Sequence, residues 1–203
     1  MSSLKHASRV TVAALAFLTF GCSGSKSADP GGTRTTAGST DSIAAGNAYD
    51  PCTKLSVAVV QPFFSAPVTM KRETDLVGTS AGCIFSTPDN TSTIQVVTVT
   101  GPPSAAFYNG NRMQDGVPSI QLAGVGDKAM REPKDVWIYA LKRDTFCMIH
   151  SDKHGRSQMR GLQKFADADV PDAVASRMAA QLGTLCNTIY GSGTREPSFA
   201  GLD

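Results

Sequence analysis

The residues best suited to chemistry lie close together in the second half of the chain. His150, Asp152 and His154 are spaced by two, so on a continuing strand they would offer two imidazoles and a carboxylate to a metal ion on one side. The surrounding residues 153–156, which combine basic side chains with a glycine, are instead typical of a solvated loop. We therefore expect a polar hairpin end here and no metal site.

Ser151, together with Asp152 and His154, has the residue types of a hydrolytic triad. Residues this close in one segment cannot adopt the mutual geometry that a nucleophile, its base and the orienting carboxylate require. An enzyme that cleaves a polymer would need paired carboxylates converging on a cleft, and the sequence reveals no such pair. We therefore predict no catalytic residues and a protein that is not an enzyme.

Residues 124–129 read Gly-Val-Gly-Asp-Lys-Ala and match GxGxxA, the phosphate-binding turn of dinucleotide folds. That turn must open a helix of several turns, but Pro133 would end this one within about two turns. Asp127 would also place a carboxylate beside the pyrophosphate. We predict a structural glycine turn and no cofactor.

The five cysteines are Cys22, Cys52, Cys83, Cys147 and Cys186. No two of the last four lie within a few residues of each other, which argues against a metal site and against a redox-active dithiol. With Cys22 set aside for the reason given below, an even number remains, and in an exported chain this favours two disulfides. Four cysteines permit three pairings, and spacing alone does not choose among them.

Two hairpins and three helices are predicted to position these residues. Alternating and β-branched residues predict strands that pair through short polar turns: 82–86 with 93–100, and 135–141 with 145–150. A first helix starts at Asp50, a short one at Pro102, and the longest at residues 169–172. The buried stripe of the longest helix is Val170, Val174, Met178, Leu182, Leu185 and Ile189. The fold class is therefore α+β, an antiparallel sheet with N-terminal, middle and C-terminal helices packed on it.

Charge and aromatic residues add little that is specific. Removal of Lys5 and Arg9 with a signal peptide leaves 17 basic against 17 acidic residues, so nothing predicts nucleic-acid binding. A basic region after the second hairpin is expected to be a solvated surface, with contact to anionic lipid as the alternative; it comprises Lys142, Arg143, Lys153, His154, Arg156, Arg160 and Lys164. Trp137 and Tyr139 are expected to be packing residues.

The N-terminus has the three parts of an export signal. Basic residues precede an apolar run over 10–20 that is far shorter than the roughly 20 residues of a membrane span, and small residues follow it. Residues 18–22, Leu-Thr-Phe-Gly-Cys, resemble a bacterial lipobox, although Thr19 stands where Leu is preferred. We predict lipidation with palmitate-type chains at Cys22; an ordinary secretory signal is the alternative, and both export the protein.

Four segments are therefore expected. Residues 1–21 are a lipoprotein signal peptide, and residues 22–49, dominated by small and polar residues, are a disordered tether. Residues 50–191 form the α+β domain, and 192–203 are a flexible tail.

The combination of Asp50-Pro51-Cys52 after the tether, Gly82-Cys83 opening a strand and the 124–129 motif resembles a group of small actinobacterial lipoproteins of unknown function. Ile84 stands where that group often has Trp. The resemblance implies an envelope protein, a fold that is possibly PsbP-like, and a disulfide between Cys52 and Cys83. Cys186, on the buried side of the last helix, can then reach Cys147 on a strand.

These observations predict a non-enzymatic lipoprotein on the outer face of the cell membrane. We expect it to bind a protein, a lipid or a small molecule that the sequence does not identify. An envelope-polymer-modifying enzyme with an unrecognised active site is the alternative.

Overall fold

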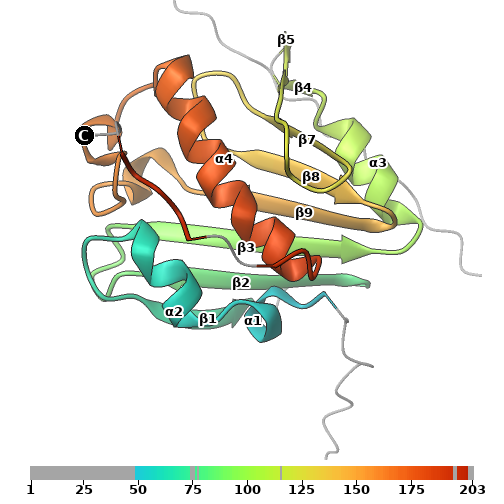
Figure 1. Ribbon diagram of the computed structural model, residues 1–203, viewed down its shortest axis with the longest axis horizontal. Helices are drawn as coiled ribbons and strands as arrows, with labels where there is room; N and C mark the ends of the chain where they lie inside the picture. The colour runs from blue at the N-terminus through green and yellow to red at the C-terminus, as the bar shows by residue number, and fades with distance from the viewer. Residues whose placement is uncertain (1–48, 74–75, 77, 115, 194–195, 201–203) are drawn as a thin grey trace, which may run out of the picture. The chain divides into compact units, whose positions relative to one another are not determined.

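Seven strands form one antiparallel sheet in the order β1-β2-β3-β9-β8-β7-β6 (Figure 1). The computed structural model describes residues 49–73, 76, 78–114, 116–193 and 196–200. The predicted signal peptide, almost all of the predicted tether and Cys22 therefore lie outside the described residues. The predicted α+β class, an antiparallel sheet with helices packed on it, is confirmed.

The strands of the large sheet are β1 (Thr69–Glu73), β2 (Ser80–Ser86), β3 (Thr93–Thr100), β6 (Ile120–Gln121), β7 (Lys128–Arg131), β8 (Ile138–Lys142) and β9 (Thr145–His150). Both predicted hairpins are confirmed, since β2 pairs with β3 and β8 with β9. Two further strands, β4 (Met113–Gln114) and β5 (Val117–Pro118), form a separate small hairpin. Strand β7 was not predicted, because only four residues after the glycine turn pair with β8, too few for a clear strand pattern.

The N-terminal helix is broken into short pieces instead of the single helix that the spacing predicts. These pieces are α1 (Pro51–Lys54), α2 (Val57–Val60) and the 3-10 turn η1 (Gln61–Phe63). Asp50 caps α1 by accepting from the Cys52 N–H, but Leu55 has an extended backbone. Ser56 then begins a new helix, because its side chain accepts a hydrogen bond from the Val59 N–H.

The middle and C-terminal helices follow their predicted patterns. Helix α3 (Pro103–Gly110) begins with a proline in its first turn. Helix α4 (Asp172–Ile189) begins three residues later than the earliest predicted start, because the Val170 N–H donates to the Lys134 carbonyl instead of entering the helix. The predicted stripe is buried, with Val174 partly buried at its margin.

The two faces of the sheet have different covers, and Figure 1 shows α4 lying across one of them. The covered face carries Phe85, Ile94, Val96, Ile138 and Ile149, which form the main core with α4 and the N-terminal turns. The open face carries residues of alternating position on the same strands, among them Ile84, Gln95, Tyr139, Met148 and His150. Helix α3 packs on one end of it through Tyr108.

Two disulfides fasten helices to the covered face. Cys147 of β9 is bonded to Cys186 of α4, and Cys52 of α1 is bonded to Cys83 of β2. These are the pairs preferred in the sequence analysis. Each bridge joins elements far apart in the chain, so each restricts the unfolded state.

Among the described residues, none of the helices is both long and apolar enough to cross a lipid bilayer.

Candidate functional site

The open face exposes side chains with binding chemistry where β8 begins and β9 ends. Gln95 of β3 lies directly opposite His150 of β9, and Ile84 of β2 lies opposite Gln95. Trp137, just before β8, packs against His150, and Met148 lies two residues back along β9. All five are half-buried. We call this set, Ile84, Gln95, Trp137, Met148 and His150, the Trp137 platform.

Trp137 and His150 form the centre of the platform. Their ring centroids lie 3.5 Å apart with 48° between the ring planes. Burial is the main influence on His150 and lowers its pKa to about 4, against smaller opposing contributions from Asp152 and Asp135. The imidazole is therefore neutral at neutral pH, and no described residue hydrogen-bonds its ring nitrogens.

Gln95 is held in place by a carboxylate from the edge strand. Its Nε2 donates to Glu73 Oε2 at 2.8 Å. Gly82 makes this possible, because a Cβ there would lie 2.5 Å from Glu73 Oε2 and 2.7 Å from Leu76 Cδ1. The glycine thus allows Glu73 to lie across β2 and to fix the amide of Gln95.

Tyr139 lies next to Trp137 at one side of the platform. It is buried, and its ring centroid lies 6.4 Å from that of Trp137. Its hydroxyl donates to the Glu132 carboxylate. Burial first, and then this hydrogen bond, raise the pKa of Tyr139, so the hydroxyl stays protonated and acts as a fixed donor. The prediction that Tyr139 is a packing residue agrees with its burial, whereas Trp137 retains exposed surface.

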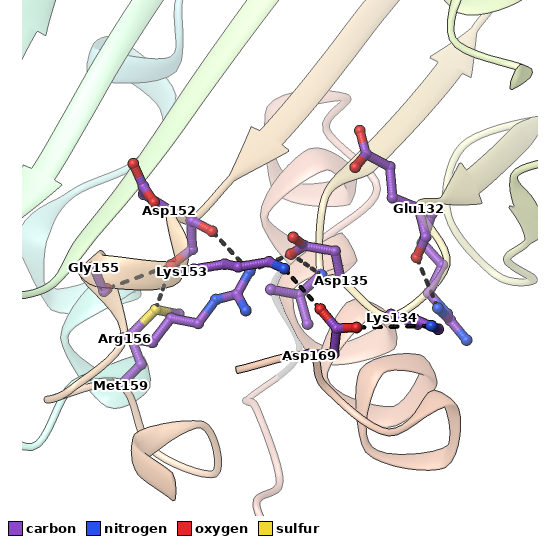
Figure 2. A network of polar contacts seen from close by, with 12 residues as sticks. Glu132, Lys134, Asp135, Asp152, Lys153, Gly155, Arg156, Met159 and Asp169 are labelled. Carbon is purple, nitrogen blue, oxygen red and sulfur yellow. Dashed lines mark hydrogen bonds and ion pairs between the residues drawn. The ribbon is translucent and has the colours of Figure 1, made fainter. Parts of the chain in front are cut away.

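A buried ion pair joins the two segments that carry the platform rings (Figure 2). Arg156 is fully buried, and its Nη2 donates to Asp135 Oδ1 and, at 3.0 Å, to the Ser151 carbonyl. Asp135 precedes Trp137 by two residues, and Ser151 follows His150. One guanidinium therefore fixes the spacing between the Trp137 and His150 backbones. The expectation that Arg156 is solvated is wrong.

The same guanidinium is only partly satisfied. Its Nε and Nη1 have no hydrogen-bond partner among the described residues. Asp135 also accepts from the Val136 N–H at 2.6 Å, so its carboxylate is oriented from two sides. This charge is buried because tertiary packing encloses it, which residues 153–156 alone do not reveal.

Exposed ion pairs lie beside this buried pair, as Figure 2 shows. Lys153 Nζ is 2.7 Å from Asp169 Oδ1, and Lys134 Nζ is 3.7 Å from Asp169 Oδ2. The hydrogen bond from Lys153 is the main cause that lowers the pKa of Asp169, and it raises that of Lys153. The Lys153 pair connects the loop after β9 to the segment before α4, and the Lys134 pair connects the loop before β8 to the same segment.

The structure separates the residues that could have bound a metal. His150 packs on Trp137, Asp152 accepts from the His154 N–H at 3.2 Å, and His154 Nδ1 lies 2.7 Å from Asp167 Oδ1. No group of three His, Cys, Asp or Glu side chains within the described ranges is placed to hold a metal ion. Ser151 Oγ contacts Met159 Sδ and the Gly155 carbonyl, and no histidine or carboxylate in the described part of the chain hydrogen-bonds to it.

A second catalytic pattern, absent from the predictions above, lies at residues 78–82, which read Gly-Thr-Ser-Ala-Gly and match GxSxG. The serine of that motif must occupy a sharp turn between a strand and a helix. Ser80 instead begins β2 and pairs with Val99, while His150 pairs with Gln95 about 13 Å away along β3. Ser80 therefore occupies a position at the start of a strand and not the strand-to-helix turn that the GxSxG motif requires.

The glycine motif at 124–129 fastens the end of α4 to the sheet. The Gly126 N–H donates to Asn187 Oδ1 at 3.0 Å, and Asn187 Nδ2 donates to the Gly124 carbonyl at 2.8 Å. Gly126 has φ of +55°, and a Cβ there would lie 2.8 Å from the Leu141 carbonyl oxygen. Asp127 Oδ2 accepts from the Arg143 N–H in the β8–β9 turn. The motif acts as a structural turn, as predicted.

The predicted basic surface is divided in the structure. Lys142 ends β8 and Arg143 lies in the turn before β9, whereas the other basic residues of the set follow the opposite end of β9. Of those, Lys153 and His154 face aspartates, and Arg160 Nε donates to the Phe64 carbonyl. The set therefore forms no continuous cationic face.

A pocket of about 370 Å³ lies between the 123–125 loop, α4 and residues 192–193. Its polar lining groups already bond within the protein: Asn187 to the loop, Thr184 Oγ1 to the Gln181 carbonyl, and Gln181 Oε1 to the Ser198 N–H. The Trp137 platform, whose imidazole has no such partner within the described ranges, is the stronger candidate for binding.

Comparison of the chain with protein-family models, with curated proteins and with solved structures found no match. The candidate site therefore rests on its own geometry, which provides stacking and hydrogen-bonding groups but no paired nucleophile and base.

Proposed function

We propose that this protein is a non-enzymatic, lipid-anchored binding module of the cell envelope, and that the Trp137 platform holds its ligand. The observation that carries the proposal is the half-buried pair of Trp137 and His150 on a sheet face that α4 leaves uncovered. An aromatic ring beside an imidazole whose nitrogens bond to none of the described residues offers both apolar contact and hydrogen bonding.

The export part of the proposal rests on two supports. The N-terminal sequence places Cys22 directly after an apolar run and a small residue. Two disulfides in one domain are typical of proteins that fold in an oxidising compartment.

Anchoring is tested by mass spectrometry of the membrane fraction. We expect a mature chain that begins with a diacylated Cys22, and we expect Cys22→Ser to release the protein from the membrane. A mature, soluble chain with an unmodified Cys22 would contradict the anchor.

Binding is tested with the only tryptophan of the chain, Trp137, whose emission reports on the platform alone. The full chain, purified in a zwitterionic detergent, is titrated with fractionated lipids and glycans of the envelope, which contain no tryptophan. We expect a saturable change in emission with one fraction. The absence of any response would contradict the platform as a binding site.

A further inference from the structure

We infer that the ligand of the Trp137 platform is an uncharged saccharide of about two rings. This inference rests on the proposed function, because it names the class of ligand for the same face. Its basis is the neutrality, the length and the hydrogen-bonding character of the platform.

The charges of the open face disfavour an ionic ligand. Lys71 and Glu73 of β1 carry opposite charges at one margin, and Glu132 at the other margin is bonded to the Tyr139 hydroxyl. The five platform residues carry no charge at neutral pH, since His150 is neutral. An anion would meet no excess of positive charge, and a cation would meet carboxylates that already accept hydrogen bonds.

The platform extends across several neighbouring segments of the sheet. Gln95, His150 and Trp137 lie on three neighbouring segments, which span about 10 Å at the ordinary spacing of strands. That length suits two sugar rings. The C–H face of one ring would stack on Trp137, as apolar surfaces pack on aromatic rings.

Hydroxyl groups of such a ligand would meet matching partners. His150 in its neutral form has one donor and one acceptor nitrogen, and Gln95 keeps its carbonyl oxygen while its Nε2 is held by Glu73. Arg156 acts as a positioning residue, since it joins Asp135 to the Ser151 carbonyl and so fixes the two rings relative to each other. A preformed platform of this kind spends little ordering entropy on binding.

The test uses the full chain in a zwitterionic detergent, because glycosidic detergents would compete. It is titrated with maltose, cellobiose and N,N′-diacetylchitobiose, and binding is read by Trp137 emission and by calorimetry. Choline and a uronic-acid disaccharide serve as charged comparators. We expect at least one neutral disaccharide to bind saturably and more tightly than either comparator.

Three variants locate the interaction, with calorimetry as the readout and circular dichroism as the check of folding. Trp137→Leu should weaken binding about tenfold or more, and Gln95→Leu about fivefold. Gln163→Leu is the matched control, because Gln163 is an exposed glutamine of the 3-10 turn η3 (Gln163–Phe165); it should leave the dissociation constant unchanged. If Trp137→Leu fails to fold, the dissociation constant of Gln95→Leu decides whether the disaccharide binds at the platform.

The outcomes separate this inference from the proposed function. Tighter binding of a charged comparator, or a response to an envelope fraction without any response to neutral disaccharides, overturns the saccharide class and leaves the platform as a binding site. Equal weakening by Gln95→Leu and Gln163→Leu also overturns the inference. No response to any probe or fraction overturns both.

Discussion

The same strands form the covered and the open face of the sheet, yet the two faces are built differently. On the covered face Phe85, Ile94 and Ile149 are fully buried beneath α4, and two disulfides fasten helices to it. On the open face the alternating neighbours Ile84, Gln95 and His150 keep exposed surface. An antiparallel sheet can leave one face in water, because its hydrogen bonds run within the sheet.

The difference separates residues that stabilise the domain from residues of the proposed binding site. Substitutions on the covered face remove packing, and substitutions on the open face remove groups that a ligand would contact. Arg156 lies between the two roles, since its burial depends on packing while its contacts position the platform.

The largest expected contrast lies between two adjacent residues of β2. Phe85→Ala should lower the free energy of unfolding by about 3–5 kcal/mol, because it leaves a cavity in the main core. Ile84→Ala, on the open face, should cost about 1 kcal/mol, because less apolar area is buried there. Denaturant unfolding measures both, and equal losses would contradict the two-face description.

Loss of the disulfide between β9 and α4 is expected to have the next largest effect on the free energy of unfolding. Its 39-residue separation predicts a contribution of about 4 kcal/mol from the restricted unfolded chain. The Cys147→Ala/Cys186→Ala double variant should lower the free energy of unfolding by that amount. Peptide mapping without reduction should first recover Cys52 linked to Cys83 and Cys147 linked to Cys186; a Cys52–Cys186 peptide would refute the pairing.

Removing the partner of the buried guanidinium should have a smaller but clear effect. Asp135→Asn leaves the Arg156 charge uncompensated and should cost about 3 kcal/mol. Asp172→Asn is the matched control, because Arg131 would still donate to the Glu132 carbonyl and to Ser176 Oγ. If the two variants lost equal stability in thermal unfolding, Asp135 would have no special role.

The smallest effect is a pH dependence that arises on the open face. The pKa of His150 is lower in the folded protein, at about 4, than the ordinary 6.5 expected when unfolded. As the pH falls from about 6.5 to 4, the unfolded state gains a proton that the folded state does not, so stability should decrease. His150→Gln should flatten this part of the curve, as denaturant unfolding at a series of pH values would measure; an unchanged slope would contradict the effect of burial on the imidazole.

Much of the fold followed from local patterns. The turn at residues 88–90 and the one at 142–144 lie between β-rich runs, and the stripe of α4 follows the helical period. These features depend on neighbours in the chain, so the hairpins and α4 were predicted close to their observed bounds. Leu55, by contrast, matched the helical spacing but lies between two short helices, because Ser56 caps the second.

The candidate site was predicted only in part. The sequence drew attention to His150 and Trp137, but for metal binding and for packing respectively. Their contact depends on the register in which β9 pairs with β8. Because Ile138 pairs with Ile149, the preceding Trp137 lies beside His150, although the two residues are 13 positions apart in the chain. Gln95 and Glu73 carried no signal, since their roles depend on pairing across three strands and on the space above Gly82.

The sequence by itself determined the α+β class and the even set of four domain cysteines, because these depend on composition, spacing and local periodicity. Only the tertiary structure decided which face of the sheet stays open. It also decided that Arg156 is buried against Asp135 and that Asn187 hydrogen-bonds to the 124–129 turn. Burial and hydrogen-bond partners are properties of surroundings, and these surroundings are assembled from segments distant in the chain.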